Sequence, residues 1–431
     1  MTRYSVGVTD DDRPPPRRSR RKVLLYTLGG VSAAAGAYIG HSEWDKRRVP
    51  PGAARVEPRE GVIEKGAVVA ERRKLGRTGV EVGVVGIGAG GLDRATSPRL
   101  IERAVDHGMT YIDTSVCYGD SEDVIGRTLS DAKHLRDKLV IATKWDPGHR
   151  ATKAEMIASL DKSLRRMGTD HVDFMQIHWL GGGHMLGDSG FNRLDNPALY
   201  EAMDEAKKSG KVRFFGATSH HEKRAAILEH AIDKGAFDLV LVKMNVLDHQ
   251  EAGIPRLIAH AKAKGVAVVA MKSQPGGGRL PEGYASSRYS VFQANVRWCL
   301  EQGASCVVHS SIPVDEHAQD LAASAVSKKL GARDLLLLDG YARALSPEYC
   351  RGCGEACRAA CPDGVAIEHV LQFDMYDSQY GWHDAAREHY RALPERERWS
   401  ERCTSCNACS AACPYGVDAA PRVRRARSQL G

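Results

Sequence analysis

The sequence lacks an excess of basic charge outside its first 50 residues. The 431-residue chain has a formal net charge of +7, but residues 1–50 hold ten Lys and Arg against five Asp and Glu. That segment therefore carries +5 of the charge, which leaves +2 for all the other residues. A nucleic-acid-binding domain needs a basic face on its folded surface. The charge distribution therefore excludes nucleic acid as an expected partner.

The N-terminal segment, residues 1–40, which we call the leader, lacks the strongly hydrophobic run of a transmembrane helix. After Ser19-Arg20-Arg21 the apolar segment extends from Val23 to Gly40 and consists largely of small residues; its length, about 18 residues, is at the lower limit for spanning a bilayer. The paired arginines followed by Leu-Leu resemble a twin-arginine signal, which exports folded proteins. We therefore expect residues 1–40 to be an export signal that places the protein in the periplasm or outside the cell. Membrane contact is expected only through an uncleaved leader, and the polar residues 41–71 are expected to form a linker.

The chain also lacks the glycine-rich dinucleotide fingerprint of a doubly wound sheet. Gly86-x-Gly88-x-Gly90-Gly91 leads into Leu-Asp rather than into a helix, so it reads as a tight turn. What is present instead is a repeated alternation of apolar strands and helical periods. The eight strand candidates are residues 82–87, 110–113, 139–144, 172–178, 212–216, 239–244, 267–271 and 306–309. This rhythm predicts an α/β fold, a (β/α)8 TIM barrel, over residues 72–330.

Polar side chains end three consecutive strand candidates. Asp113 ends the second, with Tyr118 five residues later, while Lys144 and His178 end the third and fourth. In a TIM barrel these strand ends meet at the catalytic face. A tyrosine, whose pKa is ordinarily about 10, needs a neighbouring cation to act near neutral pH. Lys144 held by Asp113 would supply that cation, and His178 would orient a substrate oxygen, so the four residues predict hydride-transfer chemistry.

The same residues carry a family resemblance. The segment from Asp113 to Gly126 resembles the aldo-keto reductase signature, and Ala-Thr-Lys144 and Gln-Ile-His178 stand where that family has its lysine and histidine. The resemblance extends over about residues 72–325. It implies that Tyr118 protonates the carbonyl oxygen of a small-molecule substrate while NADPH or NADH delivers hydride, or that the reverse occurs with an alcohol.

The resemblance also implies positions for the nicotinamide cofactor. Thr218 and Ser219 stand where the family has Ser and Asn, and the other expected cofactor-binding residues are Asn245, Lys272, Ser310 and Ser311. The arginine that the family uses to bind a 2′-phosphate is missing from the loop His309–Pro313. Because phosphate prefers Arg or Lys partners, the sequence leaves NADP and NAD both open.

Eight of the 11 cysteines form two groups near the C-terminus. The second group has the spacing of a bacterial 4Fe-4S ferredoxin run, and the first has one extra residue in its second interval. Zinc usually takes two separated cysteine pairs, and thiols two residues apart form poor disulfides. We therefore expect residues 331–431 to be a small, mostly helical, ferredoxin-like iron–sulfur domain with two 4Fe-4S clusters, or one cluster and a degenerate site. In two-cluster ferredoxins the fourth cysteine of each group binds the other group's cluster. The expected ligands are Cys350, Cys353, Cys357, Cys361, Cys403, Cys406, Cys409 and Cys413.

The predicted export signal and the predicted iron–sulfur domain are consistent with one another. A protein that holds iron–sulfur clusters must be loaded before it crosses the membrane, and the twin-arginine route carries folded cargo. We expect an exported oxidoreductase that couples NAD(P)-linked hydride transfer to 4Fe-4S electron transfer, with a redox partner protein. The alternative is a non-catalytic barrel in an exported iron–sulfur protein that transfers electrons or binds a partner.

Overall fold

The computed structural model describes residues 69, 71–92, 98–181, 190–221, 223–247, 253–275, 291–310, 329–352, 355–378 and 383–431. The expected export signal and all of the expected linker except Val69 and Glu71 lie outside the described residues. Within the described ranges, no helix is long and apolar enough to cross a membrane.

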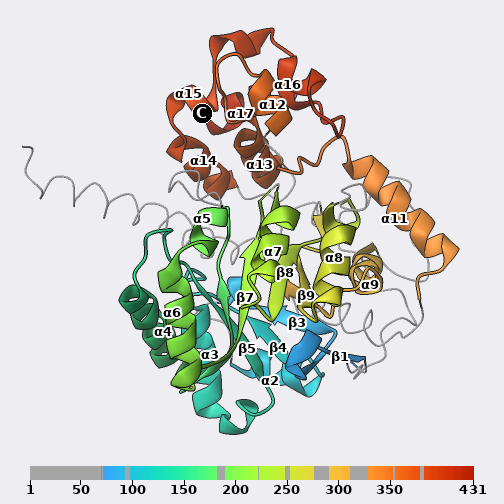
Figure 1. The fold of residues 1–431 in the computed structure, drawn as a ribbon. Helices are drawn as coiled ribbons and strands as arrows, with labels where there is room; N and C mark the ends of the chain where they lie inside the picture. Colours follow the sequence, from blue (N-terminus) through green and yellow to red (C-terminus); the bar gives the residue numbers. More distant parts are fainter. Residues whose placement is uncertain are drawn as a thin grey trace, which may run out of the picture.

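Eight parallel strands close into a barrel, as Figure 1 shows, and the predicted (β/α)8 fold is confirmed. Around the barrel the order is β10-β3-β4-β5-β6-β7-β8-β9, so each strand from β3 to β10 lies beside its neighbours in sequence. The strands are β3 Val85–Gly88, β4 Tyr111–Asp113, β5 Val140–Trp145, β6 Val172–Ile177, β7 Val212–Ser219, β8 Leu239–Lys243, β9 Ala267–Met271 and β10 Cys306–Ser310.

Helices surround the barrel. They are α2 Arg99–Asp106, α3 Ser121–Asp131, α4 Lys153–Met167, α5 Phe191–Leu194, α6 Pro197–Lys208, α7 Arg224–Asp233, α8 Gly253–Ala263 and α9 Val291–Glu301. Helix α4 shows how local sequence fixes the ends. A capping box joins Thr152 and Glu155 at its start, and Gly168, with φ 61°, ends it in the left-handed conformation.

The expected first strand, residues 82–87, is wrong as one element. The structure divides it into β2 Glu81–Gly83, which pairs antiparallel with β1 Arg72–Lys74, and the barrel strand β3. At Gly83 a Cβ atom would lie 2.2 Å from the carbonyl oxygen of Gly108, so only glycine permits this close approach. Leu75, which follows β1, is buried with the inward-facing strand side chains. The hairpin thus closes the amino end of the barrel.

The C-terminal segment is mostly helical, as predicted. Helix α11 Ala332–Leu345 packs beside α9 of the barrel. The other helices form a separate hydrophobic cluster, in which Asp374 of α13 binds Arg422 and Arg425 of α17 at 2.8 and 2.6 Å. They are α12 Glu355–Ala360, α13 Ile367–Ser378, α14 His383–Ala392, α15 Glu395–Arg398, α16 Ala408–Ala411 and α17 Ala419–Leu430.

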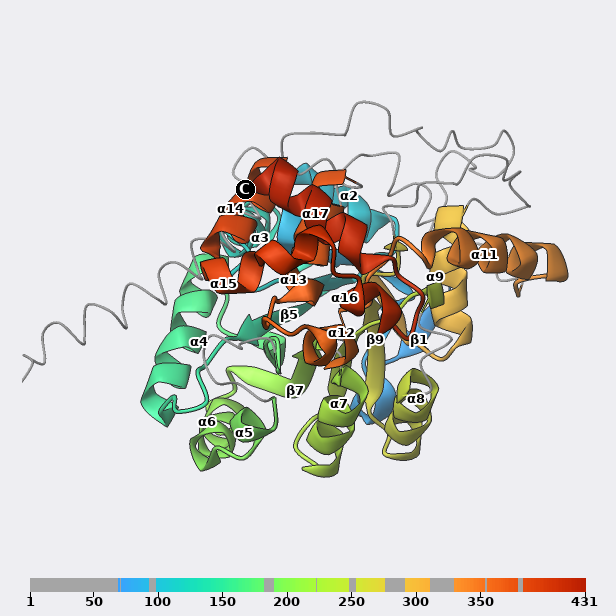
Figure 2. The ribbon, with the colours of Figure 1, turned by 90° about the horizontal axis from the view of Figure 1, so that it is seen from above.

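These cysteine-bearing helices lie over the carboxyl ends of the barrel strands. Figure 1 shows them above the barrel, and Figure 2 shows them covering part of it from above. Lys243, the last residue of β8, donates a hydrogen bond from Nζ to the carbonyl oxygen of Arg351 at 3.3 Å. The hydroxyl of Tyr341 donates to the carbonyl oxygen of Pro275, shortly after β9. The segment that carries the cysteines is therefore docked on the edge of the barrel where catalytic residues are expected.

Candidate functional site

Asp113 and Lys144 form a buried ion pair at the ends of adjacent strands. The register places Asp113 of β4 beside Ala142 of β5, and Lys144 Nζ lies 2.6 Å from Asp113 Oδ2. Lys144 also donates to the carbonyl oxygen of Thr114 at 2.7 Å, while Gln176 Nε2 donates to Asp113 Oδ1 at 2.7 Å. Both carboxylate oxygens therefore accept a hydrogen bond, and the ammonium group is held in one place.

Tyr118 lies next to that ammonium group. Lys144 Nζ is 4.4 Å from the centroid of the tyrosine ring, and the imidazole of His178 packs edge-on with its centroid 5.9 Å from the same ring. The loop that carries Tyr118 is fixed by Arg166 of α4, which donates to the carbonyl oxygen of Gly119 at 2.5 Å. The three expected catalytic side chains and their acidic partner are thus brought together at the ends of three adjacent strands, β4, β5 and β6.

Burial lowers the pKa of both basic groups. Burial lowers the pKa of Lys144, and Asp113 opposes that shift. The pKa of His178 lies well below its usual value, because of burial first and then the positive charges of Lys144, Arg193 and Lys272. His178 is therefore a neutral imidazole near neutral pH. A neutral ring can donate one N–H to a substrate oxygen without adding a second positive charge beside Lys144.

Two residues at this edge of the barrel have strained backbones. Trp179 follows His178 with φ 54°, and Lys272 follows β9 with φ 55°; among the described residues they are the only non-glycine residues with positive φ. Such conformations cost about 1–3 kcal/mol each and cluster at functional sites. The indole of Trp179 is 40% exposed, which is unusual for a large apolar side chain. Trp179 directly follows His178, and the positive charge of Lys272 acts on the His178 ring.

The expected cofactor residues of β7 and β8 hold the neighbouring loops. Thr218 Oγ1 accepts a hydrogen bond from the Trp179 backbone N–H at 2.8 Å, and Ser219 Oγ donates to the Leu180 carbonyl at 2.8 Å. Asn245 Nδ2 donates to the Lys272 carbonyl at 3.2 Å. Within the described part of the chain these three side chains are hydrogen-bonded to the backbone of the two strained turns.

The other expected cofactor residues are found after β9 and at the end of β10. Lys272 is exposed at the end of β9, where its charge acts on His178. The backbone of Ser310 ends β10 beside Gly88 of β3, whereas the Ser310 side chain and the whole of Ser311 lie outside the described residues.

Sequence reasoning missed several members of the site. Asp146 follows β5 and approaches His178, with Oδ2 3.9 Å from His178 Nδ1. Gln176 of β6 lies two residues before His178, and the expected strand 172–178 contained both, so the period of two was a usable signal that both face the same side. Cys117 donates to Asp146 at 3.4 Å, and burial, reinforced by Asp146, raises the pKa of its thiol to about 12. A thiol with so high a pKa is a poor nucleophile at neutral pH.

The C-terminal cysteines are arranged as two sets of thiols. Cys361 lines a small cavity together with Cys403, Cys406 and Cys409 of the second group. Cys413 lies close enough to Cys350 for its charge to raise the pKa of that thiol, which burial raises most. Cys361 thus lies among cysteines of the second group, and Cys413 lies near one cysteine of the first, which is compatible with crossed ligation.

The donor chemistry of these sets fits a 4Fe-4S cluster. All ten cysteines that the structure describes are free thiols, and Cys353 lies outside the described residues. Backbone N–H groups point at the sulfur atoms, from Val365 to Cys361 and from Val417 to Cys413, both at 3.3 Å. Such N–H···S bonds are a feature that tunes the reduction potential of iron–sulfur clusters.

Comparison with known proteins matches both parts of the chain. The profile of the Aldo/keto reductase family matches residues 81–327, more than half of the sequence. The profile of the 4Fe-4S dicluster domain matches residues 349–417.

Among curated relatives, the aldo-keto reductase YhdN of Bacillus subtilis is 30% identical over 166 residues, which cover 35% of this chain and 47% of that protein. The D-galacturonate reductase of Fragaria ananassa is 29% identical over 255 residues, covering 53% of this chain and 77% of that protein. The chain spans about half to two thirds of the length of several curated relatives, with shares of 61%, 47% and 64%.

A crystal structure of an aldo/keto reductase from Brucella melitensis is similar with a TM-score of 0.50. The sequence identity is 21%, and the match covers 62% of this chain and 97% of that one. A likeness at this identity concerns the fold alone.

Proposed function

The chain belongs to the aldo/keto reductase family, and from that premise we propose that it is an oxidoreductase that transfers hydride between a nicotinamide cofactor and a small carbonyl or alcohol. The observation that carries the proposal is the contact of Tyr118 with a buried, acid-paired lysine. Lys144 Nζ lies 4.4 Å from the tyrosine ring and 2.6 Å from Asp113. A tyrosine that only packs would need no buried ion pair at its side.

Tyr118 acts as the general acid in carbonyl reduction. Its hydroxyl gives a proton to the carbonyl oxygen and becomes a phenolate, which the ammonium of Lys144 stabilises. Asp113 is the positioning residue that keeps this ammonium charged in its buried place. NADPH or NADH, when bound, supplies the hydride to the carbonyl carbon. In alcohol oxidation the same groups act in reverse, and the phenolate takes the hydroxyl proton.

His178 orients the substrate. Because its pKa lies well below the usual value, the ring stays neutral over the physiological range. A neutral N–H donor steadies the carbonyl oxygen next to the Tyr118 hydroxyl, and the two groups face each other across 5.9 Å between ring centroids. The exposed indole of Trp179 offers an apolar surface to the rest of a small substrate.

Residues at the ends of β7 to β10 form the proposed cofactor site. Lys272 brings a positive charge to this edge, which suits the anionic pyrophosphate of either cofactor. The loop after β10 carries serines rather than the arginine that would favour a 2′-phosphate, so we propose that NADP and NAD are both accepted.

We also propose two 4Fe-4S clusters with crossed ligation. Cys361, Cys403, Cys406 and Cys409 hold one, supported by the cavity that they line. Cys350, Cys353, Cys357 and Cys413 hold the other, supported by the proximity of the first and last of these. Together two clusters store two electrons, the number that a hydride carries. A redox partner protein would exchange electrons with them.

The position of the cysteine-bearing helices supports a functional connection between the barrel and the proposed clusters. Lys243 ends a barrel strand, bonds to the backbone of Arg351 and lies 5.4 Å from the ring of Tyr349. Its positive charge also lowers the pKa of the Cys350 thiol against the effect of burial. One residue therefore belongs both to the catalytic edge of the barrel and to the surroundings of a cluster ligand.

Export by a twin-arginine signal in residues 1–40 completes the proposal, and it accounts for loading the clusters before the protein leaves the cytoplasm. Cofactor carried with the folded protein would then serve the barrel outside, where free NADPH is not expected.

The test is a titration of the anaerobically purified protein with NADPH and NADH. Quenching of tryptophan fluorescence and turnover of simple aldehydes are followed, with Tyr118→Phe as the matched control. We expect binding in both proteins and turnover in wild type alone. Binding of neither cofactor by the wild type would refute the hydride-transfer function and leave the non-catalytic alternative. In parallel, about eight irons per chain are expected, and about four would show a single cluster.

A further inference from the structure

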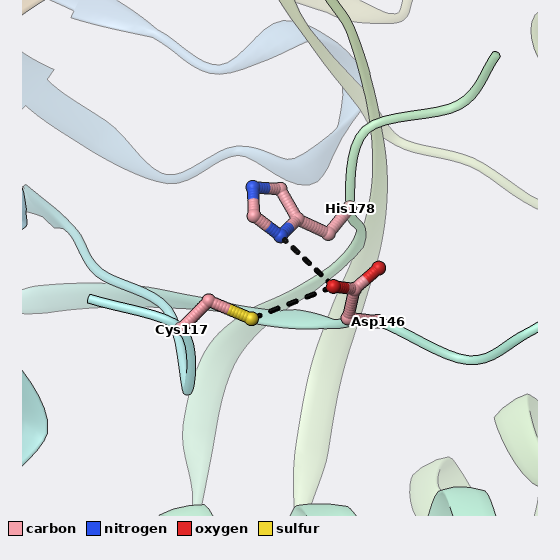
Figure 3. A group of neighbouring side chains, drawn as sticks. All are labelled: Cys117, Asp146 and His178. Atoms are coloured by element: carbon pink, nitrogen blue, oxygen red, sulfur yellow. Dashed lines mark hydrogen bonds and ion pairs between the residues drawn. The ribbon is translucent and has the colours of Figure 1, made fainter. Parts of the chain in front are cut away.

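A second set of side chains converges beside the catalytic tyrosine. Cys117 follows β4, Asp146 follows β5 and His178 follows β6, so three adjacent strands each contribute one residue. A thiol sulfur, a carboxylate oxygen and an imidazole nitrogen from these residues all lie within 4.8 Å of one another. Figure 3 shows the thiol and the imidazole pointing at the same carboxylate. None of the proposed hydride-transfer steps uses this convergence.

The distances suit a tetrahedral metal ion. Cys117 Sγ is 3.4 Å from Asp146 Oδ2, and His178 Nδ1 is 3.9 Å from the same oxygen. Zinc bonds of about 2.3 Å to sulfur and about 2.0–2.2 Å to nitrogen or oxygen place a tetrahedral nitrogen–oxygen pair about 3.3–3.5 Å apart and a pair that includes sulfur about 3.5–3.7 Å apart. The first distance is about 0.1–0.3 Å too short and the second roughly half an ångström too long, so metal binding requires small shifts of these side chains.

The donor set selects the class of ion. One sulfur, one nitrogen and one oxygen are ligands for a borderline-soft divalent cation such as zinc, whereas magnesium and calcium take oxygen ligands. Three protein ligands leave a fourth position open, which is the pattern of zinc sites that keep a water or substrate. Arg193 lies 3.7 Å from the other carboxylate oxygen, Oδ1, and so holds the orientation in which Oδ2 faces the thiol and the imidazole.

We propose that Cys117, Asp146 and His178 form a binding site for one zinc-like divalent cation at the catalytic edge of the barrel. Binding replaces the thiol proton, so a proton is released as the sulfur–metal bond forms. A cation on Nδ1 leaves Nε2 as the only N–H donor of His178. The metal state of the site would then fix the tautomer of the residue that faces the substrate.

The test uses Co2+ as a spectroscopic substitute for zinc, with the holoprotein kept anaerobic and its clusters oxidised. Bound cobalt is counted by equilibrium dialysis and observed as high-spin Co2+ by electron paramagnetic resonance. The variants are Cys117→Ser and Asp146→Asn. Cys299→Ser is the matched control, because Cys299 is a buried thiol that donates to the Met244 carbonyl at 3.4 Å, away from this site.

We expect wild type and Cys299→Ser to bind one Co2+ per chain more than Cys117→Ser binds. Asp146→Asn should bind that cobalt at least about tenfold more weakly, since even an outer partner of a metal ligand is worth 10–100-fold. Equal cobalt binding with the same spectrum in wild type and Cys117→Ser would overturn the proposal. If Cys117→Ser loses its iron or does not fold, unchanged affinity in Asp146→Asn overturns it instead. Neither measurement needs aldehyde turnover, so it stands apart from the test of the proposed function.

Discussion

Replacing Lys144 with methionine is the perturbation that bears most sharply on the proposed chemistry. Methionine has a similar length and no charge, so the change removes the ammonium group beside Tyr118 while filling much of the same space. Taking 4.4 Å as the separation of the charge from the ring, the Coulomb energy at an effective dielectric constant of about 20 is about 4 kcal/mol. This energy stabilises the phenolate that forms as Tyr118 gives up its proton.

We therefore expect kcat for aldehyde reduction to fall by roughly 10³-fold in Lys144→Met, since each 1.4 kcal/mol is a factor of ten. The fall lies within the range of about 10²–10⁴ for general acid catalysis. The same change leaves Asp113 buried without its ion-pair partner. Breaking a buried pair in this way costs about 3–5 kcal/mol, so the free energy of unfolding should also drop.

A double variant separates the two effects. In Asp113→Asn/Lys144→Met both charges are gone, and the Gln176 amide still has an acceptor at residue 113. Denaturant unfolding should show most of the lost stability restored, while steady-state kinetics with NADPH should remain as slow as in Lys144→Met. Activity that returns together with stability would refute the reasoning, because Lys144 would then act only on the fold. A loss below tenfold in Lys144→Met would refute it as well.

Three further predictions concern other groups. Tyr118→Phe should lower kcat by about 10²–10⁴-fold with little change in unfolding free energy, and kinetics paired with denaturation will check both. The pKa of His178 in the folded protein is depressed below its ordinary value of 6.5. As the pH falls below 6.5, His178 therefore takes up a proton in the unfolded chain but not in the folded protein. The free energy of unfolding should therefore fall by up to about 1.4 kcal/mol per pH unit because of this group. Urea unfolding at several pH values should show a shallower fall in His178→Gln than in wild type. An identical dependence of stability on pH in the two proteins would count against a neutral buried histidine. Crossed ligation makes Cys361 and Cys409 ligands of the same cluster. We therefore expect Cys361→Ser and Cys409→Ser each to lose about four iron atoms per chain and to keep the same paramagnetic signal from the other cluster. Different remaining signals in the two variants would contradict that arrangement.

The barrel, and the convergence of the expected catalytic residues at one edge of it, could be predicted because their signals are local. Lys144 and His178 each end an apolar run, and parallel strands in a barrel bring such ends to one face. The charge state of His178 could not be predicted, because it depends on burial and on cations from other elements, among them Arg193 and Lys272.

Contacts between residues that are far apart in the sequence could not be predicted. Lys243 stands within the apolar strand candidate 239–244, and its partner Arg351 is 108 positions later. Neither sequence segment shows that the two parts of the molecule meet there. Likewise, Asp146 carries no motif of its own, and its importance follows only from the way β4, β5 and β6 place Cys117 and His178 beside it.

The cysteine groups could be predicted in part. Spacing alone predicted the ligand type, and a known pattern of crossed ligation predicted the partners. The structure adds the positions of these cysteines. Cys361 lies with Cys403, Cys406 and Cys409 around one cavity, and Cys350 lies near Lys243 of the barrel.

The most direct test of the central claim follows the hydride itself. The wild-type protein is incubated in a single turnover with nicotinamide cofactor carrying deuterium at C4 and with a simple aldehyde, and the alcohol product is analysed by mass spectrometry and NMR. The proposed reaction predicts one deuterium on the former carbonyl carbon, delivered from one face of the nicotinamide ring, and almost none in Tyr118→Phe. Alcohol without deuterium, or equal labelling by Tyr118→Phe, would contradict it.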